Sequence, residues 1–148
     1  MRAKQFFLRA RSAERDIHRL ESMRDHYIAI GATKTAQIGG IGSRTINNSS
    51  KVERAVLGAL EAEIGISEEL SRYRAIVAEA ENVISRVPQE RFREILSLHY
   101  LAGMTLADVA RRMGYKHTEN LYRAHGWALA AAQKIIDGRE TDGNHTGN

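Results

Sequence analysis

The chain has 148 residues, of which 43% are apolar and 27% carry a charge. This length allows one compact domain, or a small module joined to an extended helical element, and leaves no room for a second enzyme-sized domain. The absence of cysteine excludes structural disulfides, thiolate metal sites and cysteine nucleophiles. A single proline, the residue that helices tolerate least, favours an all-α fold.

The net charge of +4 is distributed unevenly along the chain. Lysine and arginine outnumber aspartate and glutamate in residues 1–34 and 88–137, whereas residues 51–86 are acidic overall. The basic ends permit a polyanionic partner, although a solvated charged surface explains them equally well. Because no apolar run is long enough for a signal peptide or a membrane span, we expect a soluble cytoplasmic protein with no membrane partner.

Two segments of different character make up the first third of the chain. Residues 12–30 place apolar side chains at steps of three or four, which predicts an amphipathic helix ending at Gly31. Residues 31–50 are rich in glycine, serine, threonine and asparagine and have no hydrophobic period. We therefore predict a flexible linker over residues 31–50.

A heptad pattern then extends over residues 52–87, with apolar side chains at alternating steps of four and three and Glu63 as its one polar position. The corresponding helix would be on the order of 50 Å long. Its apolar stripe needs a partner, which is the first helix folded back antiparallel, a copy of the same helix in a homodimer, or both. Residues 1–87 are thus predicted to form a helical hairpin or coiled coil.

Three shorter helices are predicted for residues 88–137. Pro88 suits the first turn of the first of these, and Gly103 ends it. Thr105 and Asp108 approximate a capping box for the second helix. The third runs from near Thr118 to about Ile136, and the polar residues 138–148 are expected to be disordered.

The second and third of these helices have the pattern of a helix-turn-helix. Such a motif needs a small residue where its helices cross, a glycine at the turn and apolar residues facing inward from the second helix. Ala110, Gly114 and Leu121 meet these requirements in turn. The predicted core of this C-terminal domain contains Phe92, Leu96, Leu106, Val109, Ala110, Leu121 and Leu129.

The outward face of the last helix follows from its inward residue. With Leu121 pointing inward, a step of 100° per residue places Glu119, Tyr122 and Arg123 on the opposite side, free to enter a groove. Arg111 and Arg112 project from the preceding helix and could hold phosphates, which position a protein on a duplex without reading its sequence.

The run VPQERFREILSLHYLAGMTLADVARRMGYKHTENLYRAHGWALAAA resembles region 4 of bacterial sigma factors. It resembles even more closely the sigma-like phage late-transcription regulators of the RinA/ArpU kind. The matching elements are the helix ending in LHYLAG, the TLADVARRMGY unit and the RAHGWAL continuation. The resemblance implies a sequence-specific DNA-binding regulator that acts on transcription by host RNA polymerase in the bacterial cytoplasm.

The same resemblance implies which residues face double-stranded DNA. Between Gly114 and Leu121 the chain has one residue more than the usual sigma-type spacing, so Lys116 and His117 fall either at the helix start or in the turn. In the groove, Glu119 would favour cytosine and Arg123 would favour guanine. The full predicted DNA-binding set is Arg111, Arg112, Lys116, His117, Thr118, Glu119, Tyr122 and Arg123.

Other functions are less well supported by the residues. No catalytic motif is present, so we expect no enzyme and no cofactor, and His117 and His125 lie about 12 Å apart along one helix, too far to chelate one metal. Tyr122 and Trp127 are expected to pack rather than stack on bases. The alternative functions are a small terminase subunit for DNA packaging and a helical scaffold that binds no nucleic acid.

Overall fold

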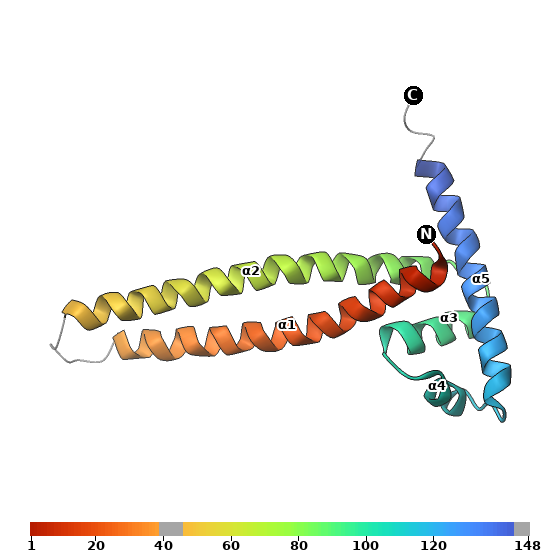
Figure 1. Ribbon diagram of the computed structural model, residues 1–148, viewed down its shortest axis with the longest axis horizontal. Helices are drawn as coiled ribbons and strands as arrows, with labels where there is room; N and C mark the ends of the chain where they lie inside the picture. Colours follow the sequence, from red (N-terminus) through yellow and green to blue (C-terminus); the bar gives the residue numbers. More distant parts are fainter. Residues whose placement is uncertain (39–45, 144–148) are drawn as a thin grey trace. The chain divides into compact units, whose positions relative to one another are not determined.

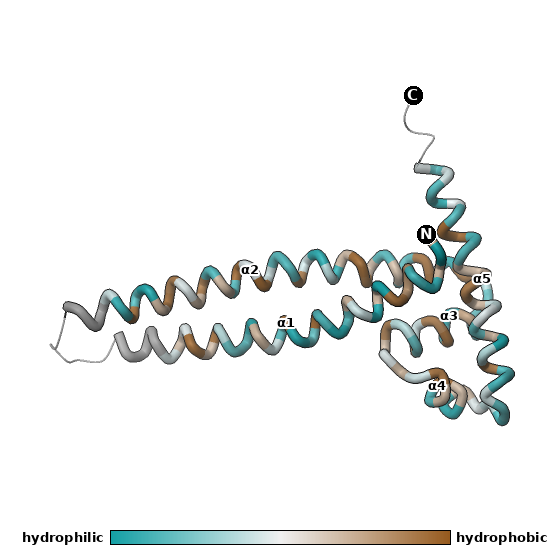
Figure 2. Tube along the Cα trace, in the orientation of Figure 1, coloured by the Kyte–Doolittle hydropathy of each residue, from teal (hydrophilic) through white to brown (hydrophobic). Residues whose placement is uncertain are grey.

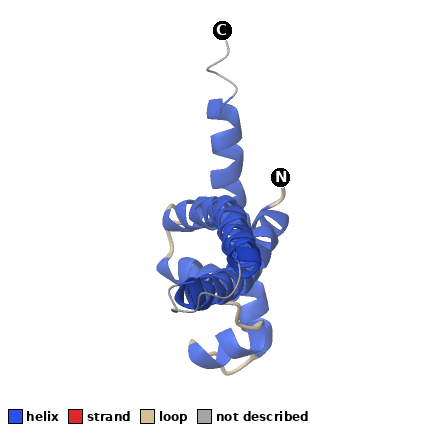
Figure 3. Cartoon of the chain, turned by 90° about the vertical axis from the view of Figure 1, so that its left-hand side faces the viewer, coloured by secondary structure: helices blue, strands red, loops and turns tan. Residues whose placement is uncertain are grey.

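The computed structural model describes residues 1–38 and 46–143, and every regular element in these two ranges is a helix (Figure 3). The all-α prediction is therefore confirmed for this part of the chain. In order, the elements are α1 (Ala3–Ile38), α2 (Ile46–Ser85), α3 (Glu90–Leu96), the π-helical turn η1 (Ser97–Leu101), α4 (Leu106–Arg112) and α5 (Thr118–Gly143) (Figure 1).

The region expected to be a flexible linker is largely helical. Helix α1 continues through Gly31 to Ile38 and α2 begins at Ile46, so the prediction for residues 31–50 is wrong at both ends. An existing helix gains one hydrogen bond for each residue it adds, and polar residues without a hydrophobic period can therefore extend it. Residues 39–45 of that prediction lie outside the described residues.

The chain divides into two compact units, and the division differs from the predicted boundary between residues 87 and 88. We call Met1–Glu14 together with Arg74–Asn148 the terminal unit, and Arg15–Tyr73 the central unit. Residues 1–87 were expected to form one region. Their first and last parts instead belong with the C-terminal helices, because both contribute apolar side chains to the core there.

The core of the terminal unit begins in the first turns of α1, which precede the helix predicted over residues 12–30. Phe7 is fully buried, and its ring stacks on that of Tyr100 with the ring centroids 5.2 Å apart. Val83 near the end of α2 and Val87 just after that helix are also fully buried. All seven predicted core residues belong to this core: Phe92, Leu96, Val109, Ala110 and Leu121 are buried, and Leu106 and Leu129 are partly buried against it.

The central unit contains the remainder of α1 and the first part of α2. Its buried apolar residues are Ile17 and Leu20 from α1 and Ala59, Ile66 and Leu70 from α2. Apolar positions recur along α2 (Figure 2), and those of the predicted heptad are all buried or half-buried in the single chain. The heptad seam is therefore covered within one chain, and the homodimer alternative stays a prediction.

A second set of apolar residues on α2 remains exposed. Leu57, Leu60 and Ile64 have exposed fractions of 58%, 49% and 60%. Their spacing of three and four residues places them on one side of the helix, away from the heptad positions. If a homodimer forms through residues 52–87, these residues are available to it.

The ends of two further helices differ from expectation. Helix α5 extends to Gly143, so the predicted disorder is wrong for residues 138–143, and residues 144–148 lie outside the described residues. The terminal amine of Met1 forms an ion pair of 3.1 Å with Glu140, which ties this end of α5 to the start of the chain. Helix α3 begins at Glu90 with Gln89 as its N-cap residue, so Pro88 precedes the first turn instead of starting it.

Candidate nucleic-acid interface

The start of α4 is fixed by a side-chain cap, as the sequence predicted. The hydroxyl oxygen of Thr105 accepts a hydrogen bond of 3.1 Å from the backbone N–H of Asp108. The Asp108 carboxylate also forms an ion pair with Arg111. Hydrogen bonds from the Thr105 side chain and then from Arg111 lower the pKa of Asp108 below its usual value. Arg111 therefore shares its charge with a neighbouring carboxylate.

The turn after α4 depends on Gly114, whose φ of 79° lies in the left-handed region that favours glycine. The N–H of Tyr115 donates to the carbonyl of Ala110 at 2.9 Å, and the N–H of Gly114 donates to that of Arg111 at 3.3 Å. This pair of bonds is a Schellman motif. It ends α4 and directs the chain toward the start of α5.

Helix α5 has one buried face, which carries Leu121, Ala124, Ala128, Ala132 and Ile136. Small residues at three of these positions permit close packing against the other helices of the terminal unit. The expectation that Leu121 points inward is met, since its side chain is fully buried. The opposite face of α5 is consequently presented to solvent.

The eight predicted DNA-binding residues are all exposed. Because α5 begins at Thr118, Lys116 and His117 lie in the turn before it, which resolves the alternative left by the sequence. The structure thus brings the set together on the end of α4, the following turn and the first two turns of α5. By location, the eight are Arg111 and Arg112 on α4, Lys116 and His117 in the turn, and Thr118, Glu119, Tyr122 and Arg123 on α5.

Two aromatic side chains on α5 do not pack as expected. Tyr122 is 50% exposed and Trp127 is 57% exposed. The packing expectation for both is wrong, because both side chains lie off the buried face of α5. The outward position of Trp127 follows from the sequence, because Trp127 lies four residues after the outward-facing Arg123.

The terminal unit also contains a group of polar aromatic residues that the sequence did not reveal. The Tyr100 hydroxyl and Nε2 of His125 share a hydrogen bond of 2.8 Å. His99 donates from Nδ1 to the Met104 carbonyl at 2.6 Å, which leaves its Nε2 facing an Arg11 guanidinium nitrogen at 3.5 Å. The residues come from α1, η1 and α5, so no local sequence pattern connects them.

Burial changes the acid–base behaviour of this group. It lowers the pKa of His125 to about 4, with smaller effects from His99 and Lys4. Burial also lowers the pKa of His99 and raises that of Tyr100 to about 12. Both histidines are therefore neutral at neutral pH. Within the described residues no group of three metal-ligating side chains is found, and the histidine pair is better explained as packing.

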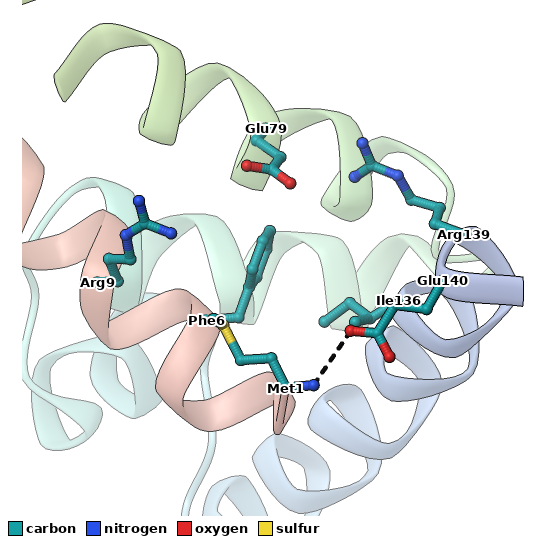
Figure 4. Close-up of a pocket in the computed structure, with 7 residues that line it drawn as sticks. All are labelled: Met1, Phe6, Arg9, Glu79, Ile136, Arg139 and Glu140. Carbon is teal, nitrogen blue, oxygen red and sulfur yellow. Dashed lines mark hydrogen bonds and ion pairs between the residues drawn. The ribbon is translucent and has the colours of Figure 1, made fainter. Parts of the chain in front are cut away.

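A shallow pocket also lies within the terminal unit, with a volume of about 300 Å³ (Figure 4). Phe6 and Ile136 supply its apolar surface. Its rim carries both guanidinium and carboxylate groups, so it favours neither anions nor cations. The charged lining residues are Arg9, Glu79, Arg139 and Glu140.

Comparison with models of known families, with curated proteins and with solved structures gave no match for this chain. No described helix has an apolar stretch long enough to cross a membrane.

Proposed function

We propose that this protein is a sequence-specific DNA-binding regulator of transcription, with α5 as its recognition helix. The observation that carries this proposal is the exposure of all eight side chains around the α4 end, the turn and the start of α5, opposite a fully buried Leu121. Five of the eight are arginine, lysine or histidine. The resemblance to sigma region 4 and to phage late-transcription regulators supports the same conclusion.

The residues of this surface are proposed to have separate roles. Arg123 reads a guanine through a bidentate contact and Glu119 accepts a hydrogen bond from cytosine, since both project from the first turns of α5. Arg112 holds a phosphate. Arg111 contributes less to phosphate binding, because Asp108 already pairs with it. Host RNA polymerase is the proposed protein partner, and the regulated genes are late genes of a phage.

Selection from random duplex DNA tests the proposal directly. The expected result is one enriched sequence that the protein binds more tightly than mixed-sequence duplex. Arg123→Ala should relax the preference at one base pair, with a loss of roughly 1 to 3 kcal/mol in discrimination. Arg112→Ala should weaken binding to all sequences alike and lower the salt slope by about one unit.

The control is Arg72→Ala, which removes the same charge from an exposed position on α2 in the central unit. This variant should bind like the wild type. No enriched sequence, together with no binding at low salt, would contradict the proposal. The terminase alternative would be favoured by three results together: specific DNA binding, no change in transcript yield from a late promoter, and a ring-shaped oligomer in light scattering.

A further inference from the structure

The exposed face of α5 continues beyond the residues assigned to DNA reading. Arg123, Trp127, Ala130 and Lys134 follow one another at steps of four, three and four, and all are exposed. This spacing aligns them along one side of the helix. Trp127, at 57% exposure, is the largest side chain of this stripe. We refer to these four residues as the α5 stripe.

The charges around the α5 stripe are suited to a polyanion. Its two charged members, Arg123 and Lys134, are both cationic and stand on either side of the indole. Asp137, the nearest acidic residue in the later turns, accepts a hydrogen bond of 2.8 Å from Gln133. Gln133 in turn accepts from the backbone of Ala3, so this carboxylate is held toward the start of α1. The positive charges of Arg123 and Lys134 therefore favour a phosphate group as the ligand of the α5 stripe.

Distances along the helix indicate which part of a duplex each residue would reach. At 1.5 Å per residue, Trp127 lies about 6 Å beyond Arg123 along the axis, and Lys134 lies about 16 Å beyond it. The N-terminal residues of a recognition helix contact base edges in a groove about 12 Å wide, and a straight helix then leaves the curved groove. The third and later turns consequently approach the sugar–phosphate backbone.

From this geometry we propose that the α5 stripe binds the backbone of duplex DNA at the edge of the major groove. The indole of Trp127 packs against a deoxyribose and donates its Nε1–H to a phosphate oxygen. Lys134 neutralises a further phosphate on the same strand. This inference rests on the proposed function, and it extends the interface by about three turns beyond the residues that the family resemblance implies.

The only tryptophan in the sequence makes the inference directly measurable. Its fluorescence is followed while duplex DNA is added, and binding is followed independently by the anisotropy of an end-labelled duplex. The expected result is a change in tryptophan emission and reduced quenching by acrylamide, at the same DNA concentration that raises the anisotropy. A titration with the same concentrations of single-stranded DNA of the same sequence should change the tryptophan emission less than the duplex does.

Variants then separate the two side chains. Trp127→Phe keeps an aromatic ring but lacks the N–H donor, and it should weaken binding several-fold for specific and mixed-sequence duplex alike. Lys134→Ala should lower the salt slope by about one unit. Lys51→Ala removes the charge of another exposed lysine, on α2, and serves as the matched control, with no expected change. Circular dichroism melts should show that all three variants fold like the wild type.

The outcomes distinguish this inference from the proposed function. One result would overturn the role of the α5 stripe and leave DNA recognition intact. In that case the wild type binds DNA by anisotropy, its tryptophan emission does not change, and Trp127→Phe and Lys134→Ala bind with unchanged affinity. Stronger emission changes with single strands than with duplex would also overturn it, because they would indicate base stacking. Absence of binding by anisotropy would remove the proposed function and this inference with it.

Discussion

Gly114 occupies the turn between α4 and α5 with a positive φ, although the space around it would accept a Cβ atom. Replacing it with alanine should therefore destabilise the fold through backbone strain alone, by about 1 to 2 kcal/mol. Gly58→Ala is the matched control. It lies inside α2 with equally open surroundings, and alanine there should stabilise the protein by up to about 1 kcal/mol. Urea denaturation of both variants measures the change in the free energy of unfolding, which should be negative for Gly114→Ala and positive for Gly58→Ala.

His125 should make the stability of the terminal unit depend on pH. Its folded pKa of about 4 lies below the usual 6.5, so the unfolded chain takes up a proton between these values that the folded chain does not. The free energy of unfolding should fall as the pH drops from about 6.5 to about 4, by about 1 to 2 kcal/mol once solvent screening is allowed for. Below pH 4 the stability that the neutral His125 contributes at higher pH is fully lost.

His125→Asn tests this sign, because asparagine cannot titrate in that range. Chemical denaturation at a series of pH values should give a shallower slope for the variant than for the wild type between pH 6.5 and 4. His99 keeps part of the dependence in the variant, since burial also lowers its pKa. Equal slopes for the two proteins would contradict the assignment.

Single residues were predictable where a local period or turn rule applied. The inward position of Leu121, the cap at Thr105 and the turn at Gly114 follow from spacing and backbone preference, and each is found in the structure. The hydrogen bond between Tyr100 and His125 joins positions 25 residues apart on different elements. No short-range rule connects such positions, so this contact and its effect on pKa required the fold.

The first turns of α1 show how an element can be overlooked in the sequence. Phe7 is fully buried in the terminal unit, while its neighbour Leu8 is 42% exposed. Phe7→Ala should lower the free energy of unfolding by about 3 to 5 kcal/mol, because it removes a ring stacked on Tyr100 and leaves a cavity. Leu8→Ala is the adjacent control and should cost far less. Similar melting temperatures for the two variants would show that Phe7 is not part of this core.

Helix boundaries were predicted less well than helix positions. The glycine and polar residues after residue 30 indicated a linker, yet α1 continues to Ile38. Glycine inside a helix costs only about 1 kcal/mol relative to alanine, which the preceding turns of an established helix can offset. At the other end, α5 passes its last buried residue, Ile136, and continues to Gly143. Apolar periodicity identifies buried turns of a helix and says little about exposed ones.

At the scale of the whole molecule, the division into units was the feature least accessible to sequence. The heptad pattern continues without interruption to Val87, and nothing in its period indicates that the terminal unit begins at Arg74. The location of the proposed DNA-binding surface was easier to predict, because its residues are close in sequence. Its function stays a prediction.

The exposed apolar residues of α2 should promote self-association of the whole molecule. Leu57, Leu60 and Ile64 would be removed from water if two copies met through this face. Light scattering of the full chain should then show a mass that rises with protein concentration, and Leu60→Glu should abolish that rise by placing a charge in the contact. Leu8→Glu is the control, since Leu8 lies in the terminal unit. A wild-type chain that is monomeric at every concentration would exclude this homodimer.

The hydrogen bond between the backbone of Ala3 and the side chain of Gln133 joins residues 130 positions apart. Contacts between such distant positions form slowly, and during synthesis the start of α1 leaves the ribosome well before α5 exists. Until α5 emerges, the side of α1 that carries Phe7 has no partner from that helix. A prematurely terminated chain that lacks α5 should therefore expose this apolar surface. Such truncated products are expected to aggregate or be degraded rather than to accumulate as folded protein.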